Sequence, residues 1–291
     1  MSLEVVLTAK LGNTRVTGKE QFYTPITLAH TLVSNVEAVL GSLKGKSVLE
    51  PAGGTGSFVE AAFAKGAKEV ISFDIEPLHE KVILGSFLEQ ELTQRNLITI
   101  SNPPFGRNNS LSIPFFNHAA RVSDAICFIV PRSWRKWSVT NRLDLNFELV
   151  SDQDIDIDYV DSSGELISDK SRLATCFQVW KKTATPRVPV KITDMGVIEK
   201  VSPELADVSM TIFGYGCGSI KEDFERVPNT TQLFLKLNHP QALSALRSVD
   251  FSRFYKSTAY TEAMSIQEIN YLLNEQIYGD PMIEGSSRKF S

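Results

Sequence analysis

The chain has 291 residues, of which 42% are hydrophobic and 22% charged, which is enough for one large α/β domain and a small second one. Its net charge of −4 argues against indiscriminate nucleic-acid binding without excluding a local basic face, and its three cysteines and four histidines lack the spacing of a metal site. No apolar run is long enough to span a bilayer and no signal peptide is evident, so we expect a cytoplasmic protein that does not associate with membranes.

The chain is expected to begin with an irregular polar arm over residues 1–20. The segment Gln-Phe-Tyr-Thr-Pro-Ile-Thr-Leu-Ala follows at 21–29. Apolar residues then recur at helical spacing, which predicts a helix over 27–40.

A glycine-rich turn, Glu-Pro-Ala-Gly-Gly-Thr-Gly at 50–56, lies between a short apolar strand predicted at 47–50 and a helix predicted at 57–65. The helix N-terminus offers N–H groups to a carboxylate. Glycine permits positive φ and lets a ligand approach the backbone closely. We expect this role for Gly53, Gly54 and Gly56.

A second strand is predicted at 69–73 and is followed by Asp74. A carboxylate about 20 residues past such glycines binds ribose hydroxyls in nucleotide-binding folds. Asp74 is therefore a candidate ribose ligand and Glu76 a weaker one, the alternative being a solvated strand end. A short extra strand is expected within 82–87.

Asn102-Pro103-Pro104-Phe105, after a strand predicted at 97–101, is the most informative stretch. An exocyclic ring amine is a poor nucleophile, and an enzyme that modifies it must accept both N–H hydrogens. The Asn102 amide oxygen and the Pro103 carbonyl can do so. The two prolines stiffen the loop, and Phe105 can stack on a planar substrate. The alternative is an ordinary proline turn.

Strands and helices alternate along this part of the chain, which predicts a mainly parallel sheet with helices on both faces. A fourth strand is expected at 125–130 and a helix at 113–122. Ligands of such sheets bind beyond the carboxyl ends of the strands. The glycine turn, Asp74 and Asn102 all fall at such ends, so we expect them to form one site.

Residues 131–142 interleave cations with two tryptophans. Cations near aromatic rings suit a phosphate backbone and an unstacked base. The alternative is a solvated basic loop whose tryptophans pack into the core. The candidate nucleic-acid contacts are Arg107, Arg132, Trp134, Arg135 and Lys136.

The acidic stretch 152–170 is predicted to be an edge strand with solvated charges, and 175–180 a late strand of the same sheet. In the segment beyond, strands are expected at 208–213 and 231–237. A helix is expected at 265–274, where Ser265 and Glu268 have capping-box spacing. The expected organisation is an arm at 1–20, a catalytic domain at 21–184, a small α+β segment at 185–278 and a disordered tail at 279–291.

In combination, the segments at 21–29 and 50–56, Asp74 and the 102–105 loop resemble the amino-directed S-adenosylmethionine-dependent methyltransferases. The particular likeness is to the N6-adenine DNA methyltransferases with the gamma order of motifs. It extends over about residues 20–182, and 126–133 resembles the family's fifth strand and the loop after it.

The resemblance implies a Rossmann-like methyltransferase fold with a seven-stranded sheet and S-adenosylmethionine as cofactor. It makes the loop at 102–105 catalytic and the target a flipped adenine. The residues that it implies for the cofactor are Tyr23, Thr24, Glu50, Pro51, Ala52, Gly53, Gly54, Gly56, Asp74 and Ile75.

One element departs from the family. An aspartate that binds the cofactor adenine is often found where this chain has Ser86, in Gly-Ser-Phe-Leu at 85–88. Ser86 can form a hydrogen bond there without charge assistance, and Phe87 can line the adenine pocket. The alternative is that both residues only pack.

DNA is the preferred partner. An RNA adenine methyltransferase is the second hypothesis, because the same loop chemistry serves either polymer. A protein glutamine methyltransferase is the third, and the basic loop with two tryptophans argues against it. A non-catalytic subunit that keeps the fold is disfavoured by the intact loop at 102–105, whereas Ser86 leaves it open. A restriction or phage-encoded system would be a natural setting.

Overall fold

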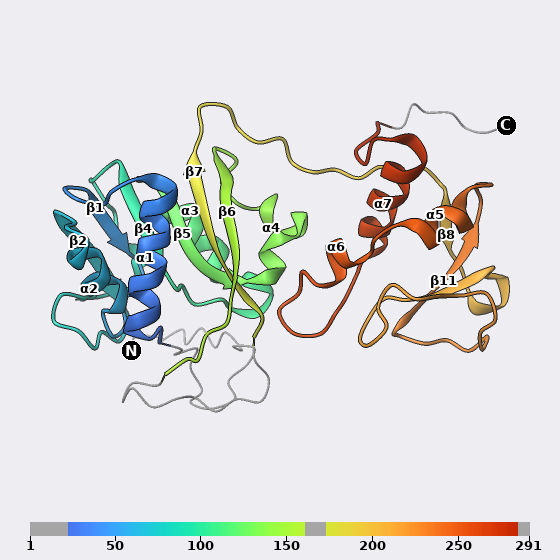
Figure 1. The fold of residues 1–291 in the computed structure, drawn as a ribbon, viewed down its shortest axis with the longest axis horizontal. Helices are drawn as coiled ribbons and strands as arrows, with labels where there is room; N and C mark the ends of the chain where they lie inside the picture. The colour runs from blue at the N-terminus through green and yellow to red at the C-terminus, as the bar shows by residue number, and fades with distance from the viewer. Residues whose placement is uncertain (1–22, 161–172, 285–291) are drawn as a thin grey trace, which may run out of the picture. The chain divides into compact units, whose positions relative to one another are not determined.

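The structure is a computed structural model of the chain that describes residues 23–160 and 173–284. The predicted arm, the first two residues of the 21–29 segment, residues 161–170 of the predicted acidic strand and the end of the predicted tail lie outside these residues. The chain forms two compact units (Figure 1). The first runs to Pro131 and resumes over Asn141–Val188, and the second contains Arg132–Thr140 and the chain from Pro189.

These units differ from the expected organisation in two ways. The division falls after Val188 instead of 184, and Arg132–Thr140 belongs to the second unit although it lies inside the segment expected to be catalytic. The chain therefore passes between the units after Pro131, after Thr140 and after Val188.

The first unit contains a seven-stranded sheet with the order β3-β2-β1-β4-β5-β7-β6. β1 to β5 pair in parallel, and β7 runs antiparallel between β5 and β6. This confirms the predicted mainly parallel sheet of a Rossmann-like methyltransferase fold. The strands are β1 Ser47–Glu50, β2 Glu69–Asp74, β3 Ile83–Leu84, β4 Leu97–Ser101, β5 Ser123–Pro131, β6 Phe147–Ile155 and β7 Thr175–Lys182.

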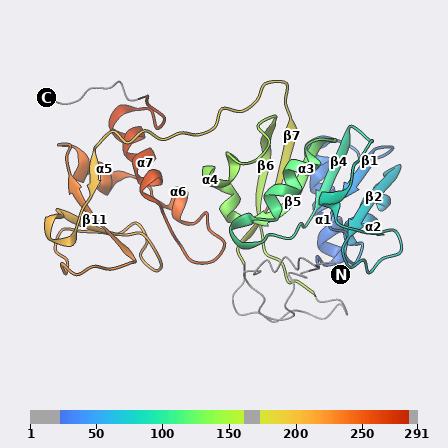
Figure 2. The same ribbon diagram turned by 180° about the vertical axis from the view of Figure 1, so that it is seen from behind.

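Helices cover both faces of this sheet because its central strands are apolar on both sides. On β5, Cys127 and Ile129 pack in one core with α1 (Ile26–Leu40) and α2 (Ser57–Ala64). Phe128 faces the other way and meets Phe116 of α3 (Ser112–Ala119), with ring centroids 6.2 Å apart. Figure 1 shows α1 and α2 in front of the sheet, and Figure 2 shows α3 from behind.

The edge strand β6 begins earlier than the predicted stretch 152–170 and ends at Ile155, so only the first part of that stretch is strand, while the acidic alternation continues just beyond it. Ile155 and Ile157 are buried, while Asp152, Asp154 and the two following aspartates are exposed. Beyond the strand, Val160 forms an antiparallel bridge with Tyr23. This bridge holds Tyr23, the first described residue, against the acidic segment.

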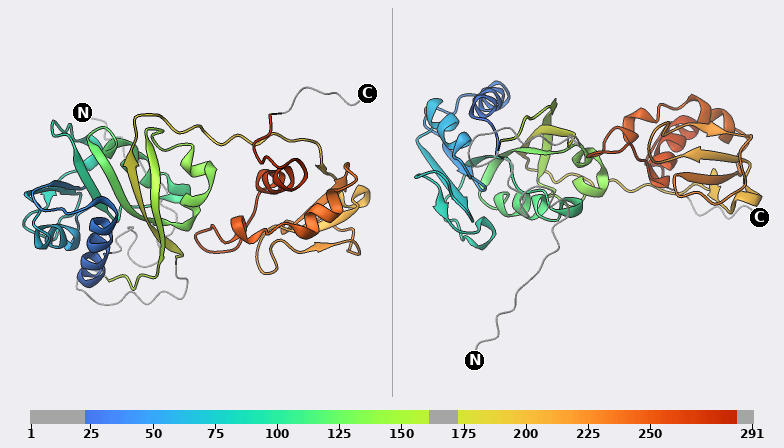
Figure 3. Two further views of the ribbon diagram at one scale, coloured as in Figure 1. Left: turned by 45° about the horizontal axis from the view of Figure 1, so that its top comes forward. Right: turned by 90° about the horizontal axis from the view of Figure 1, so that it is seen from below.

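The second unit is built on an antiparallel sheet with the order β10-β9-β11-β8. Its strands are β8 Ile198–Lys200, β9 Val208–Thr211, β10 Ile220–Lys221 and β11 Gln232–Leu237, and its helices are α4 Trp137–Thr140, α5 Ala242–Ser248, α6 Ser252–Tyr255 and α7 Ile266–Tyr278. Alternate residues of β9 and β11 face α5 and α7, which cover one face of the sheet (Figure 3). The predicted capping box at the start of α7 is confirmed.

Within the described ranges, no helix has both the length and the hydropathy that a membrane crossing requires. The same residues contain no cluster of His, Cys, Asp and Glu that could hold a metal ion.

Candidate active site

The predicted site residues lie at one edge of the seven-stranded sheet. Glu50 ends β1, Asp74 ends β2 and Ser101 ends β4, directly before Asn102. Because these strands are parallel neighbours with β1 in the middle, their carboxyl ends share an edge. The glycine turn and the 102–105 loop leave the sheet there.

The glycine turn is closed by its neighbours. Gly54 N–H donates to Asp74 Oδ2 at 2.8 Å. Gly54 has φ of +45°, and a Cβ at this position would lie 2.7 Å from Tyr23 Cε1. Gly56 has φ of +80°, and a Cβ there would lie 2.4 Å from His79 Cγ. No larger residue fits either position without displacing an aromatic side chain.

The Asp74 carboxylate is fixed by the backbone. Its second oxygen, Oδ1, accepts from Glu76 N–H at 2.8 Å, and its carbonyl accepts from Gly85 N–H at 2.8 Å. Each carboxylate oxygen has two acceptor positions, so a bound hydroxyl can still be accepted. Ile75, the next residue, is 68% exposed, which leaves an apolar side chain at the edge of the site.

Glu50 is buried, with 1% of its surface exposed. Its Oε1 accepts from Ala52 N–H at 3.0 Å and from Ser101 Oγ at 2.5 Å, while Oε2 has no hydrogen-bond partner among the described residues. Burial raises the pKa of this carboxyl to about 8, against the lowering effect of the two hydrogen bonds.

Asn102 is held by the segment at the start of the first unit. Its Nδ2 donates to Thr24 Oγ1 at 3.2 Å, across 78 residues of sequence. Thr24 is 6% exposed, and the neighbouring Tyr23 is bonded in both directions to Val160, at 3.1 and 3.2 Å. Burial, followed by the charges of Asp74 and Glu76, raises the pKa of Tyr23.

The bond to Thr24 orients the Asn102 amide. The nitrogen lies against Thr24, so the oxygen occupies the other branch of the group. That oxygen is shielded from solvent. The loop therefore presents its predicted acceptor inside the protein, and a substrate must enter to reach it.

The end of the loop is anchored to α3. The Phe105 carbonyl accepts from the N–H groups of Leu111 and Ser112, at 3.2 and 3.3 Å. The Phe105 ring is half-buried against the core shared by α1 and α2. A sharp turn follows, with positive φ at Gly106 and at two asparagines, Asn108 and Asn109.

Phe87 packs into the core in this structure. It is 1% exposed and contacts His118 edge-on, with centroids 4.7 Å apart. Ser86 begins the short 3-10 helix Phe87–Glu89, and its carbonyl accepts from Gln90 Nε2 at 3.1 Å. Of the two expected roles, packing accounts for Phe87, and Ser86 lies one residue from the Gly85–Asp74 hydrogen bond.

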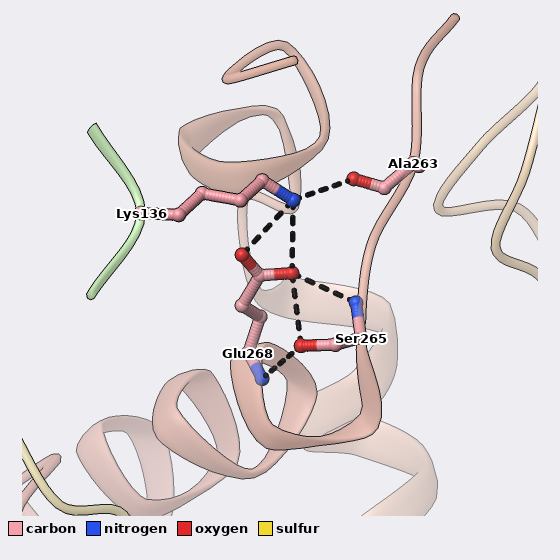
Figure 4. A network of polar contacts seen from close by, with 4 residues as sticks. All are labelled: Lys136, Ala263, Ser265 and Glu268. Carbon is pink, nitrogen blue, oxygen red and sulfur yellow. Dashed lines mark hydrogen bonds and ion pairs between the residues drawn. The ribbon is translucent and has the colours of Figure 1, made fainter. Parts of the chain in front are cut away.

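The basic segment makes its contacts in the second unit. Lys136 Nζ lies 3.1 Å from Glu268 Oε1 and donates to the Ala263 carbonyl at 3.1 Å. Ser265 N–H and Oγ donate to the other oxygen of Glu268, at 2.7 and 3.1 Å (Figure 4). Trp137 stacks on Tyr271, with centroids 5.5 Å apart. Lys136 is thus committed to an ion pair.

Trp134 is 0% exposed, so no base can stack on it in this structure. Trp134 is therefore packed in the core, as the alternative interpretation has it, whereas Lys136 is ion-paired instead of solvated. Arg132 and Arg135 are half-buried, and Arg107 is exposed beside the 102–105 loop. Arg107 is the predicted contact that the structure leaves most accessible.

Three contributors were not singled out from the sequence. Ser101 donates to Glu50, His79 lies against Gly56, and Val160 holds Tyr23. The hydroxyl of Ser101 at the end of β4, directly before Asn102, is the signal that the sequence offers for it. His79 and Val160 had no local signal, because their contacts depend on the tertiary fold.

No protein-family model matches this sequence, and no curated protein matches it. Solved structures do. A candidate RNA methyltransferase from Pyrococcus horikoshii is 25% identical, with 56% of this chain and 88% of that chain covered and a TM-score of 0.45. A candidate class I S-adenosylmethionine-dependent methyltransferase from Listeria monocytogenes is 14% identical, with coverages of 58% and 63% and a TM-score of 0.42.

A modification subunit of a candidate type I restriction enzyme from Vibrio vulnificus is 14% identical, with 84% of this chain and 59% of that chain covered and a TM-score of 0.42. The present chain thus spans little more than half of that subunit. At these TM-scores the similarity supports no functional inference, so the assignment depends on the strand order and the site itself.

Proposed function

We propose that this protein is an S-adenosylmethionine-dependent methyltransferase that acts on the N6 amine of adenine in DNA. The observation that carries the proposal is the hydrogen bond from Asn102 Nδ2 to Thr24 Oγ1. It holds the loop amide at the carboxyl edge of the sheet, next to Glu50 and the glycine turn. The acceptors proposed for the amine therefore lie next to the glycine turn, which is proposed to bind the cofactor.

The cofactor is assigned to the glycine turn and the residues around it. Asp74 accepts the ribose hydroxyls, and Ile75 offers an apolar surface to the adenine ring. Gly53, Gly54 and Gly56, with Pro51 and Ala52, border the methionine part. Tyr23 and Thr24 close that end, because Tyr23 lies against Gly54 and Thr24 against Asn102.

Catalysis depends on orientation of the amine. Asn102 Oδ1 and the Pro103 carbonyl accept its two N–H hydrogens, so that the nitrogen lone pair turns away from the ring. Pro104 keeps the loop stiff, and Phe105 stacks on the base that has left its helix. The cofactor supplies an electrophilic methyl group. The product ammonium loses its proton to water, so positioning and polarisation account for the rate.

Access to the site is the main demand on the target. The Asn102 oxygen is shielded and the Phe105 ring is half-buried. A base inside a duplex cannot reach a shielded acceptor, so the proposed target is an extruded or single-stranded base. Arg107, exposed beside the loop, is the proposed phosphate contact.

Mass spectrometry tests the proposal, applied to nucleosides for the nucleic acids and to peptides for the protein extract. The protein is incubated with S-adenosylmethionine and unmethylated DNA, and in parallel with RNA and with a protein extract. N6-methyladenine in DNA is the expected product. Methylation of RNA or of glutamine instead would transfer the same loop chemistry to another substrate and reject DNA as the target. Failure to bind S-adenosylmethionine would reject the enzyme altogether.

A further inference from the structure

The Glu50 carboxyl is as buried as a structural residue, but the described residues supply no cation to balance its charge. It is 1% exposed, and its two hydrogen-bond donors, Ala52 N–H and Ser101 O–H, are both neutral. A buried carboxylate is normally matched by a cation, because removal of its charge from water costs several kcal/mol. Among the described residues no cation takes that place.

The groups that face Glu50 come from the strands on both sides and from the turn after it. β4 contributes the Ser101 hydroxyl, and the turn contributes the Ala52 amide. β2 contributes Asp74, whose charge opposes ionisation of Glu50. Every described contribution except the two hydrogen bonds favours the neutral acid, and the pKa of about 8 reflects this balance.

The geometry also locates the proton. Both donors point at Oε1, so Oε1 is the carbonyl oxygen of the acid. The hydroxyl is then Oε2, the buried atom that lacks a hydrogen-bond partner among the described residues. Oε2 is therefore the atom that a ligand can engage.

We propose that Glu50 is a proton-linked binding residue: a cationic group of the ligand displaces the proton from Oε2 and pairs with the carboxylate that remains. This inference depends on the proposed function, because S-adenosylmethionine supplies the cation as an ammonium and a sulfonium group. The neutral acid becomes a carboxylate, the cation stays bound beside it, and one proton passes to the solvent buffer.

The same carboxyl connects the ligand to the catalytic loop. Ser101 donates to Oε1 and is the residue directly before Asn102. A carboxylate accepts a hydrogen bond more strongly than a neutral acid does. Ionisation of Glu50 therefore tightens the Ser101 bond at the base of the loop when the cofactor is present.

Calorimetry measures the proton directly. S-adenosylmethionine is titrated into the full-length protein at pH 6.5, in buffers that differ in ionisation enthalpy. We expect close to one proton released per molecule bound. The association constant is expected to rise about tenfold per pH unit between pH 6 and 7, as one linked proton requires.

Two variants test whether the released proton comes from Glu50. Glu50→Gln keeps an acceptor oxygen for Ser101 and Ala52 but cannot ionise, so the release should vanish and the slope with pH should flatten. Glu91→Gln removes an exposed carboxylate and should behave as the wild type does. Circular dichroism verifies that both fold, and the buffer series on the wild-type protein stands without either variant.

S-adenosylhomocysteine separates the two cations, since it keeps the ammonium but lacks the sulfonium. Equal release with both ligands supports a pair with the ammonium, and release with S-adenosylmethionine alone supports a pair with the sulfonium. Binding of S-adenosylmethionine with no proton exchange would overturn the inference and leave the proposed function intact. Absence of binding would overturn the proposed function.

Discussion

Two buried glutamates in this protein have opposite surroundings. Glu50, in the first unit, is 1% exposed, and the described residues near it supply two neutral donors and the like charge of Asp74. Glu268, in the second unit, is 3% exposed and has the Lys136 ammonium at 3.1 Å together with two donors from Ser265. Both are buried, but among residues 23–160 and 173–284 a cation pairs with Glu268 and none pairs with Glu50.

The two surroundings suit different roles: a structural one for Glu268 and a ligand-binding one for Glu50. A carboxylate whose charge is matched by a cation of the same chain serves the fold, because breaking such a buried pair is strongly destabilising. A buried acid without a cation can still pair with a charged ligand, and groups with strongly shifted pKa values cluster at functional sites. The proposed active site therefore belongs at Glu50 and the loop that begins after Ser101.

The largest expected effect is at Asn102, which follows Ser101 and therefore lies in the proposed active site with Glu50. Asn102→Ala should lower turnover by about 10³-fold or more, because it removes an acceptor aimed at the reacting amine. Binding of S-adenosylmethionine should change by less than about threefold. Methyl transfer and calorimetric titration measure the two quantities.

Asn146→Ala is the matched control, since Asn146 is an exposed asparagine directly before β6 and away from the carboxyl ends of β1, β2 and β4. It should leave both quantities unchanged. If Asn102→Ala loses cofactor binding and turnover together, Asn102 is structural and the assignment fails.

The next effect is at Glu268, on the structural side. Glu268→Gln should destabilise the protein by about 3 kcal/mol, because it leaves Lys136 as an uncompensated, largely buried charge. Urea unfolding measures the loss. Cofactor affinity of the protein that remains folded should stay as in the wild type. A change in cofactor affinity without a change in stability would mean that Glu268 has a functional role instead of a structural one.

A smaller effect is the pH dependence of stability from Glu50. The folded pKa of about 8 lies above the usual 4.5, so the folded protein keeps a proton that the unfolded chain has lost between these values. The contribution of Glu50 is fully present below pH 4.5 and is lost as the pH rises toward 8, by at most about 1.4 kcal/mol per pH unit.

Urea unfolding of the wild type and of Glu50→Gln at pH 5, 6, 7 and 8 isolates this term. The stability of the wild type relative to the variant should decline steadily over that range. A constant difference would mean that Glu50 is already ionised in the folded protein.

The smallest effect is at Arg107, where one exposed cation meets a polymer with many charges. Arg107→Ala should weaken DNA binding severalfold and reduce the slope of log affinity against log salt by about 1. Arg121→Ala, another exposed arginine, should keep the wild-type slope. Equal slopes for both variants would remove Arg107 from the proposed interface.

Features carried by short stretches of sequence could be predicted. Gly53, Gly54 and Gly56 indicated the turn between β1 and α2, and alternating burial at Ile155 and Ile157 follows the acidic pattern of the edge strand. The parallel sheet followed from the order of its elements. Its carboxyl edge then gathered Glu50, Asp74 and Asn102.

Features that depend on distant partners could not be predicted. Lys136 and Glu268 are 132 residues apart, and nothing near either residue indicates the other. The four-residue helix α4 is too short for its periodicity to show which unit it packs against. Likewise, the sequence does not show that Ser101 donates to Glu50, because register between strands decides it.

The three passages of the chain between the units affect how the protein can be divided. A cut near Val188 would not separate the two units, because Arg132–Thr140 would stay on the amino-terminal fragment without the rest of the second unit. Trp137 would lose the Tyr271 ring and Lys136 its counterion. A chimera that exchanges the second unit must therefore carry the nine residues Arg132–Thr140 as well as the chain from Pro189.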